Sequence, residues 1–194
     1  MKLLPAFIPL LALLGACATK PAAMTARGLF PLEVGRYWIY QLDGDKQKTV
    51  KNSIASTLTI GETQWFESIE FGEKFWIRNG DEGQMEAVNL YTKDENAAIF
   101  EKIDPKVIHE ELMFKFPARP GDTWTTLENL ISYEGIETLT VPAGDFSCHM
   151  YSIAQYGQTY SHSCIAEGIG VVYSDNILPD GKKEISRLLE WSKK

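Results

Sequence analysis

From Leu29 onward, short runs of apolar and aromatic residues alternate with clusters of turn-forming residues. The first run, residues 37–42, is aromatic and β-branched, and it stops at the turn signal Asp43-Gly44-Asp45. Such runs recur about every 8–12 residues, which is typical of antiparallel all-β domains. The further predicted strands cover residues 49–60, 64–71, 75–78, 85–91, 97–103, 131–141, 145–155, 158–165, 169–173 and 185–191.

One segment departs from the strand pattern. Residues 104–113 begin with Asp104 and Pro105, an N-cap acid followed by proline at the first helical position. These residues predict one short helix, and an extended linker is the alternative.

The N-terminus has a different pattern again. Lys2 supplies a positive charge, and residues 3–14 form an apolar run interrupted only by two prolines. This run is too short to cross a bilayer as a helix, and its layout is that of a cleaved export signal. It ends in Leu14-Gly15-Ala16-Cys17, which resembles the bacterial lipobox, whose cysteine becomes the acylated first residue of the mature protein. The alternative is an ordinary secretory signal in which Cys17 occurs by chance.

This interpretation divides the chain into three parts. Residues 1–16 are the expected lipoprotein signal peptide, residues 17–28 the acylated cysteine with a flexible tether, and residues 29–194 the β-rich domain. Ala18 follows the cysteine in place of aspartate, the residue that commonly signals inner-membrane retention in enteric bacteria. We therefore expect a lipid-anchored protein of the cell envelope, at the outer membrane and facing the periplasm.

Length and charge narrow the classes of partner. Removing residues 1–16 leaves 178 residues, enough for one domain with a sizeable core, and takes the formal net charge from −7 to −8. This acidic balance argues against a nucleic-acid partner and against a polybasic membrane-binding patch. No other apolar run approaches the roughly 20 residues of a spanning helix, so membrane attachment is expected through acyl chains such as palmitoyl on Cys17.

Cys148 and Cys164 are predicted to form a disulfide. They lie in two predicted strands, residues 145–155 and 158–165, which flank a turn at Tyr156-Gly157. In a hairpin centred on residue 156 the two cysteines fall opposite each other, within about one residue of register. The same register places Met150 opposite His162. Export would put the pair in an oxidising compartment, where a disulfide is the default.

The sequence lacks a complete catalytic motif. His109-Glu110-Glu111-Leu112-Met113 begins like the zinc metalloprotease motif, but methionine stands where the second histidine is required. There is no Gly-x-Ser-x-Gly elbow and no phosphate-binding glycine loop. A soft-metal site made by Cys148-His149-Met150 and His162-Ser163-Cys164 is a minor alternative, because a disulfide would consume both thiols. We therefore assign no catalytic residue, no metal and no cofactor.

A short motif occurs twice in the predicted domain. Phe30-Pro31-x-x-x-Gly35-x-x-Trp38 recurs 86 residues later as Phe116-Pro117-x-x-x-Gly121-x-x-Trp124. In each copy proline and glycine predict a turn, from which a strand headed by tryptophan leaves. The motif is either a shared way of starting a strand with a buried tryptophan, or the mark of two equivalent half-domains that line a common cleft.

Four blocks, in their order and spacing, resemble a family of uncharacterised exported bacterial proteins. The blocks are Pro31-Leu32-x-Val34-Gly35-x-Tyr37-Trp38-x-Tyr40, Phe116-Pro117-x-x-Pro120-Gly121-Asp122-x-Trp124, Val141-Pro142-Ala143-Gly144-x-Phe146-x-Cys148 and Gly168-Ile169-Gly170-Val171-Val172. Many members are lipoproteins with a domain of unknown function built as a curved antiparallel sheet. The resemblance covers residues 29–191 and implies a curved antiparallel sheet or half-barrel here. It implies no activity and no binding site, because the family has none to carry over.

Aromatic residues provide the remaining functional hint. Five tryptophans and eight tyrosines exceed what a small core needs. We assign most of them to the core, and expect a few to line an apolar groove on the concave side of the sheet. The predicted function is non-enzymatic binding of an apolar ligand such as a lipid, or of an envelope protein. An envelope enzyme that uses carboxylates such as Glu110 and Glu111 is the alternative. The candidate ligand-binding residues are Trp38, Trp124, Trp76 and Tyr40.

Overall fold

The computed structural model describes residues 29–88, 90, 108–178 and 180–192, and every element bounded within them is a β-strand. The strands form one antiparallel 12-stranded sheet in the order β6-β5-β4-β3-β2-β1-β12-β11-β10-β9-β8-β7. The all-β prediction is confirmed. The strands are β1 (Tyr37–Leu42), β2 (Asp45–Ile60), β3 (Thr63–Glu70), β4 (Glu73–Asn79), β5 (Gly83–Ala87), β6 (Glu110–Lys115), β7 (Thr123–Thr126), β8 (Asn129–Val141), β9 (Gly144–Gln155), β10 (Gln158–Ala166), β11 (Gly170–Ile177) and β12 (Lys183–Trp191).

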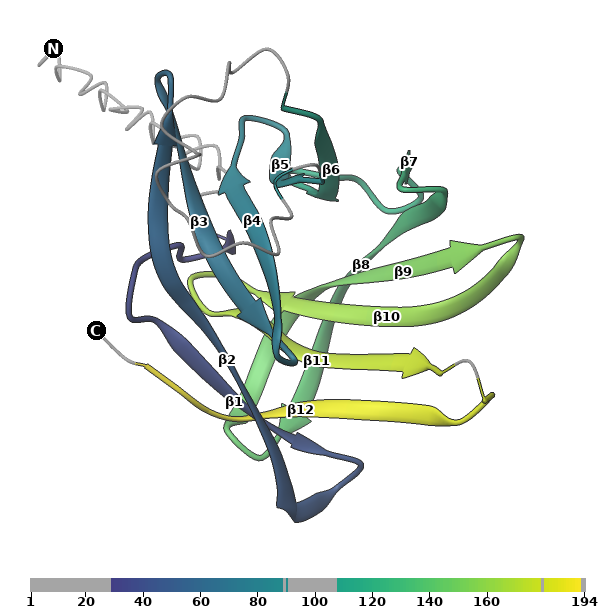
Figure 1. The fold of residues 1–194 in the computed structure, drawn as a ribbon. Helices are drawn as coiled ribbons and strands as arrows, with labels where there is room; N and C mark the ends of the chain where they lie inside the picture. The colour runs from purple at the N-terminus through teal and green to yellow at the C-terminus, as the bar shows by residue number, and fades with distance from the viewer. Residues whose placement is uncertain (1–28, 89, 91–107, 179, 193–194) are drawn as a thin grey trace, which may run out of the picture.

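The sheet coils until its two edge strands approach each other. Strands β1 and β12, from the two ends of the domain, pair in the middle, which leaves β6 and β7 as the edges. Figure 1 shows the teal β6 and the green β7 on the same side of the coil. Trp124 Nε1 on β7 donates to Leu112 O on β6 at 2.9 Å, and Thr126 Oγ1 donates to Glu111 Oε2 at 3.0 Å. These hydrogen bonds join the edges, so the predicted curved sheet is nearly closed into a barrel.

Residues with positive φ make the turns that the sequence predicts. Tyr156 and Gly157 have φ values of 50° and 77°, as a two-residue type I′ hairpin turn requires. Gly83 has a steric role, because a Cβ at this position would lie 1.9 Å from Phe114 O. Glycine at residue 83 therefore allows β5 and β6 to pair closely.

The repeated motif makes the same turn in both copies. Arg36 N donates to Glu33 O at 3.0 Å, and Asp122 N donates to Arg119 O at 2.9 Å. Gly35 and Gly121, at the third position of the two turns, have φ values of 89° and 88°. This combination defines a type II turn, which favours glycine at that position. Each turn leads directly into a strand, β1 in the first copy and β7 in the second.

The helix predicted for residues 104–113 is wrong over residues 110–113, which belong to β6. Residues 104–107 lie outside the described residues. Strand β6 pairs with β5 along its length, with Glu86 opposite Glu111 and Met85 opposite Leu112. The hydrogen bonds of this pairing override the local helix-start signal, which depends only on neighbouring residues.

Buried apolar side chains form three clusters. The first surrounds Trp38, Tyr40 and Leu188 of β1 and β12 and includes both cysteines of the hairpin. The second is aromatic and is centred on Tyr133 and Tyr151. The third packs around Trp65 of β3 and contains Ile60, Ala87 and Leu90. The first two clusters adjoin the hollows described below.

Candidate functional site

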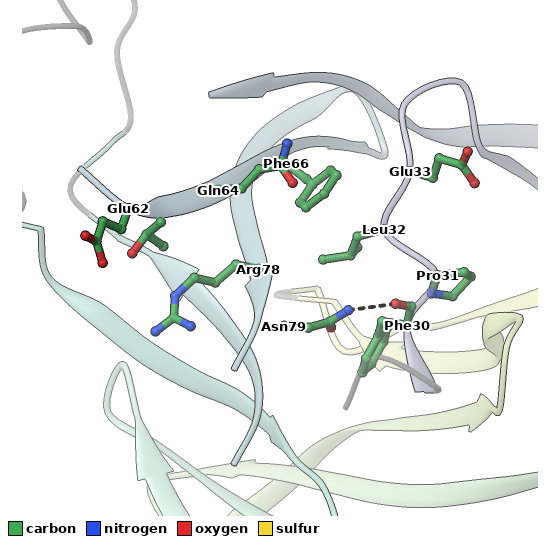
Figure 2. Close-up of a pocket in the computed structure, with 10 residues that line it drawn as sticks. Phe30, Pro31, Leu32, Glu33, Glu62, Gln64, Phe66, Arg78 and Asn79 are labelled. Atoms are coloured by element: carbon green, nitrogen blue, oxygen red, sulfur yellow. Dashed lines mark hydrogen bonds between the residues drawn. The ribbon is translucent and has the colours of Figure 1, made fainter. Parts of the chain in front are cut away.

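A groove of about 620 Å³ opens where the described domain begins, and Figure 2 shows it. We call it the N-terminal groove. The side chains of Leu32 and Phe66 give it an apolar wall, and amide, guanidinium and carboxylate groups lie along its other parts. The lining residues are Phe30, Pro31, Leu32, Glu33, Glu62, Thr63, Gln64, Phe66, Arg78 and Asn79.

Polar contacts from β4 hold this groove in shape. Asn79 Nδ2 donates to Phe30 O at 2.9 Å and so fixes the incoming chain on the end of β4. Arg78, the next lining residue, forms an ion pair with Glu110 of β6, and its guanidinium lies 5.4 Å from the centre of the Trp65 ring. The charge of Arg78 is therefore already balanced by Glu110, and the groove combines an apolar wall with polar side chains that include the carboxylates of Glu33 and Glu62.

A smaller hollow lies behind the groove, and we call it the central cavity. Its volume is about 70 Å³, and it shares Phe30, Pro31 and Leu32 with the N-terminal groove. The two spaces therefore adjoin through the same three residues. The rest of the lining combines apolar and polar side chains: Trp38, Tyr40, Asn52, Ile54, Ser68, Glu70, Ile77, Gln84, Phe114, Gly170 and Val171.

Glu70 is the carboxylic acid in the described lining of this cavity. Burial raises the pKa of its carboxyl, the hydrogen bond from Ser68 Oγ at 2.8 Å acts against this, and the neighbouring carboxyl of Glu86 raises the pKa further. Tyr40 faces the same space and donates its hydroxyl to Val171 O at 2.9 Å. Burial raises the pKa of Tyr40 far above neutrality, so its hydroxyl stays protonated.

The structure separates the four aromatic residues proposed from the sequence. Trp38 and Tyr40 line the central cavity together, and Trp38 Nε1 donates to Ile169 O at 2.6 Å. Trp124 lies at the contact between the edge strands, and Trp76 packs on the Trp65 cluster. Sequence reasoning did not find Leu32 and Phe66, which line the groove. The alternation of Phe66, Ser68 and Glu70 along β3 was the available signal, because alternate residues of a strand share one face.

A second groove of about 700 Å³ lies over strands β8–β12, and we call it the hairpin groove. Its lining includes Asp175, whose side chain is 7% exposed. Asp175 accepts hydrogen bonds from His162 Nδ1 (2.9 Å) and Tyr173 OH (2.9 Å) and pairs with Lys183 Nζ (2.8 Å). Burial alone would raise the pKa of Asp175, but these three partners together hold it below its usual value. Burial and Asp175 raise the pKa of Tyr173 to about 12, so the tyrosine remains a donor.

Replacing Asp175 with asparagine should lower the free energy of unfolding at pH 7 by about 1.5–3 kcal/mol, because buried charge-assisted hydrogen bonds are lost. The folded-state pKa of Asp175 is lowered, so its contribution is present above the unfolded pKa and is lost as the pH falls through the folded value. The difference in the free energy of unfolding between Asp175→Asn and the wild type should therefore shrink below about pH 4. Urea denaturation across pH measures this.

Asp180→Asn is the matched control for this prediction. Asp180 also pairs with a lysine, Lys182, but the two side chains are 50% and 79% exposed. An exposed pair contributes about 0–1 kcal/mol. Equal destabilisation by the two substitutions would contradict the assignment of Asp175 as the organising residue of the hairpin groove.

The disulfide between Cys148 and Cys164 is present, with the two Cα atoms 5.4 Å apart. The finer register prediction is wrong, because Met150 lies opposite Cys164 and His162 lies opposite Ser152. An irregularity between Thr159 and Ser161 shifts the pairing, and the cysteines become diagonal neighbours on one face.

The remaining candidate chemistry is dispersed over the structure. Glu110 pairs with Arg78, and Glu111 accepts hydrogen bonds from His109 Nε2 at 2.8 Å and from Thr126. The hydrogen bond from His109 leads the contacts that lower the pKa of Glu111. A carboxyl with a lowered pKa is ionised at neutral pH and is a poor general acid. Among the described residues, no group of three or more His, Cys, Asp or Glu side chains is placed to hold a metal ion.

No protein-family model and no curated protein matches the chain. Two solved structures are similar in part. A protein of Bacteroides fragilis, provisionally named an exported protein with a YmcC-like fold, has a TM-score of 0.46 and 14% identity, covering 85% of this chain and 99% of that one. A protein of Parabacteroides distasonis, provisionally named a lipoprotein, has a TM-score of 0.36 and 11% identity, covering 88% and 99%. At these values neither structure assigns this chain to a family or a function.

No helix in the described part of the chain has both the length and the apolar character needed to span a bilayer.

Proposed function

We propose that this chain is an exported, lipid-anchored protein of the bacterial cell envelope that binds an amphiphile with its apolar part in the N-terminal groove. The groove is the observation that carries the proposal. Its volume of about 620 Å³ lies within the range of about 300–1,000 Å³ that small-molecule sites occupy. Its lining joins an apolar wall to six polar residues, a combination that suits an amphiphile better than a wholly apolar ligand.

The place of the groove in the chain supports a ligand taken from a membrane. Phe30 lines the groove and is the second described residue of the domain, so the groove adjoins the end to which the predicted tether is attached. A tether over residues 17–28 reaches at most about 40 Å when fully extended. An acylated Cys17 would therefore hold the groove close to a bilayer surface, at the outer membrane if Ala18 directs the chain there.

Binding is better supported than catalysis by carboxylates. Glu110 and Glu111 each have a partner that balances or hydrogen-bonds the charge, and neither lines the N-terminal groove. Glu62 and Glu33 do line it, but they come from separate turns, and Figure 2 shows them on opposite sides of the groove. The groove thus offers a surface for an apolar chain without the paired groups that proton transfer requires.

A matched pair of substitutions tests the groove. Leu32→Glu places a charge on the apolar wall and should reduce labelling by a long-chain alkyl diazirine about tenfold or more, because burying an apolar side chain is worth about 1.5–3 kcal/mol. Val34→Glu is the control, because Val34 is 51% exposed and is not part of the lining. Mass spectrometry should locate the wild-type adducts on peptides that contain residues 30–33 and 62–66.

Melting temperatures of both variants establish that each is folded. Equal labelling of the wild type and Leu32→Glu would contradict the proposal, as would adducts placed elsewhere in the domain.

A further inference from the structure

The central cavity contains a polar side chain to which the described residues offer no hydrogen bond. Gln84 of β5 is 7% exposed and lines the cavity, and none of the described residues forms a hydrogen bond with its amide. Its amide nitrogen and oxygen therefore keep hydrogen-bonding capacity that the cavity can use. Such a group indicates a position that a water molecule or a ligand completes.

The cavity is also acidic. Glu70 lines it, Glu86 lies close enough to influence the ionisation of Glu70, and no lysine, arginine or histidine belongs to the described lining. No ion pair joins Glu70 to a described residue, although Ser68 Oγ donates to Glu70 Oε1 at 2.8 Å. A cation in the cavity would favour the ionised form of Glu70, and the Gln84 amide oxygen is a further acceptor in the same lining.

Size restricts what can enter. The cavity has about 70 Å³, which is room for a few water-sized groups, since one water occupies about 30 Å³ in the liquid. A primary ammonium is about the size of a water molecule. A phosphate, a sugar or a trimethylammonium group is several times larger. The shared residues Phe30 and Leu32 place the apolar groove directly outside.

We propose that the central cavity binds the primary ammonium head of the amphiphile whose apolar chain lies in the N-terminal groove, with Glu70 as its charge partner and Gln84 as a hydrogen-bond acceptor. This inference rests on the function proposed above and adds the chemical class of the ligand. The ammonium donates to the Glu70 carboxylate, and Gln84 contributes a further acceptor to the lining of the same cavity.

Four probes with the same alkyl chain test the head group: n-octylamine, n-octanol, octanoate and octyltrimethylammonium. They are titrated at pH 7 into the exported and processed chain held in lipid nanodiscs, with empty nanodiscs as the blank. Octylamine should bind at least about tenfold more tightly than octanol, because it gains one charge-assisted hydrogen bond. Octanoate should bind more weakly than octanol, because its carboxylate is repelled by Glu70. Octyltrimethylammonium should also bind more weakly than octanol, because its head group is too large for the cavity.

Glu70→Gln keeps the size of the side chain and removes its charge. It should reduce octylamine affinity about tenfold and leave octanol affinity within about twofold. Gln84→Leu is a second, independent variant and should also weaken octylamine more than octanol. Glu73→Gln is the matched control, because Glu73 is an exposed residue of β4 directly opposite Glu70 and is not part of the lining.

The outcomes separate the two proposals. Equal binding of octylamine and octanol overturns the ammonium assignment and leaves the apolar groove intact. The same conclusion follows if Glu70→Gln still binds octylamine more tightly than octanol. Absence of binding by all four probes overturns the groove as well. Glu70→Gln should melt at a higher temperature than the wild type, because a buried carboxylate beside Glu86 is removed, so loss of folding does not obscure its result.

Discussion

Cys17→Ser should abolish acylation of the chain and signal-peptide cleavage before residue 17. The lipoprotein pathway requires a thiol at that position, and serine offers only a hydroxyl, so the effect is expected to be all or none. Metabolic labelling with an alkynyl fatty acid and intact-mass measurement of the envelope protein detect both changes.

Ala18→Asp is the matched control for Cys17→Ser. It leaves the cysteine in place, so acylation and cleavage should continue. In an enteric host it should also move the protein from the outer to the inner membrane. If the Cys17→Ser chain were still acylated and normally processed, the interpretation of residues 14–17 as a lipobox would be wrong.

Removing the disulfide should cause a large loss of stability in the domain. The double substitution Cys148→Ala with Cys164→Ala should lower the free energy of unfolding by about 3 kcal/mol, because the bridge closes a loop with a sequence separation of 16 residues. That is a large share of the total free energy of unfolding of a typical protein, which is about 5–15 kcal/mol. Both cysteines are almost completely buried, at 1% and 0% exposure, so the loss of sulfur also leaves a small void.

Urea denaturation of the wild type, oxidised and reduced, and of the double variant measures the contribution of the disulfide. Reduced wild type should unfold at a urea concentration close to that of the double variant. Peptide mapping without reductant should recover one pair of peptides that contains Cys148 and Cys164. A stability difference below about 1 kcal/mol, or two free thiols in protein from the envelope, would contradict the role assigned to this bridge.

Local patterns in the sequence predict the strands and several turns well. The hairpin turn at Tyr156-Gly157 depends on residues that tolerate positive φ, and such information is entirely local. The cysteine pairing also follows from the position of that turn, since the disulfide tolerates a diagonal arrangement across neighbouring strands. The resemblance implied a curved sheet, and the structure shows one, although no family model matches the chain.

Long-range pairing is the part that local patterns do not contain. The pairing of β1 with β12 joins residues about 150 positions apart, and no turn connects these two strands. The irregularity near residue 160 shifts the β9–β10 register and moves Met150 from His162 to Cys164. Residues 110–113 carry a helix-start signal just before them, but their pairing with β5 makes them a strand.

The candidate site, too, was predicted only in part, because some of its residues come together only through long-range strand pairing. Trp38 and Tyr40 were predicted from composition and do line the central cavity, whereas Trp76 and Trp124 lie elsewhere. The groove combines Leu32, from before β1, with Phe66 of β3 and Asn79 of β4, and only the coiling of the sheet brings these residues together. The sequence does not distinguish Glu70 from the many other acids, because its burial depends on which face of β3 turns inward.

If the proposed function is correct, the native protein carries an amphiphile in the N-terminal groove. The most direct measurement is mass spectrometry of the lipids that co-purify with the natively expressed protein, compared with Leu32→Glu and Val34→Glu. We expect one class of amine-bearing amphiphile at near-stoichiometric amount in the wild type and in Val34→Glu, and its loss in Leu32→Glu. Apolar molecules no more abundant than in a mock purification, or equal amounts in all three proteins, would contradict it.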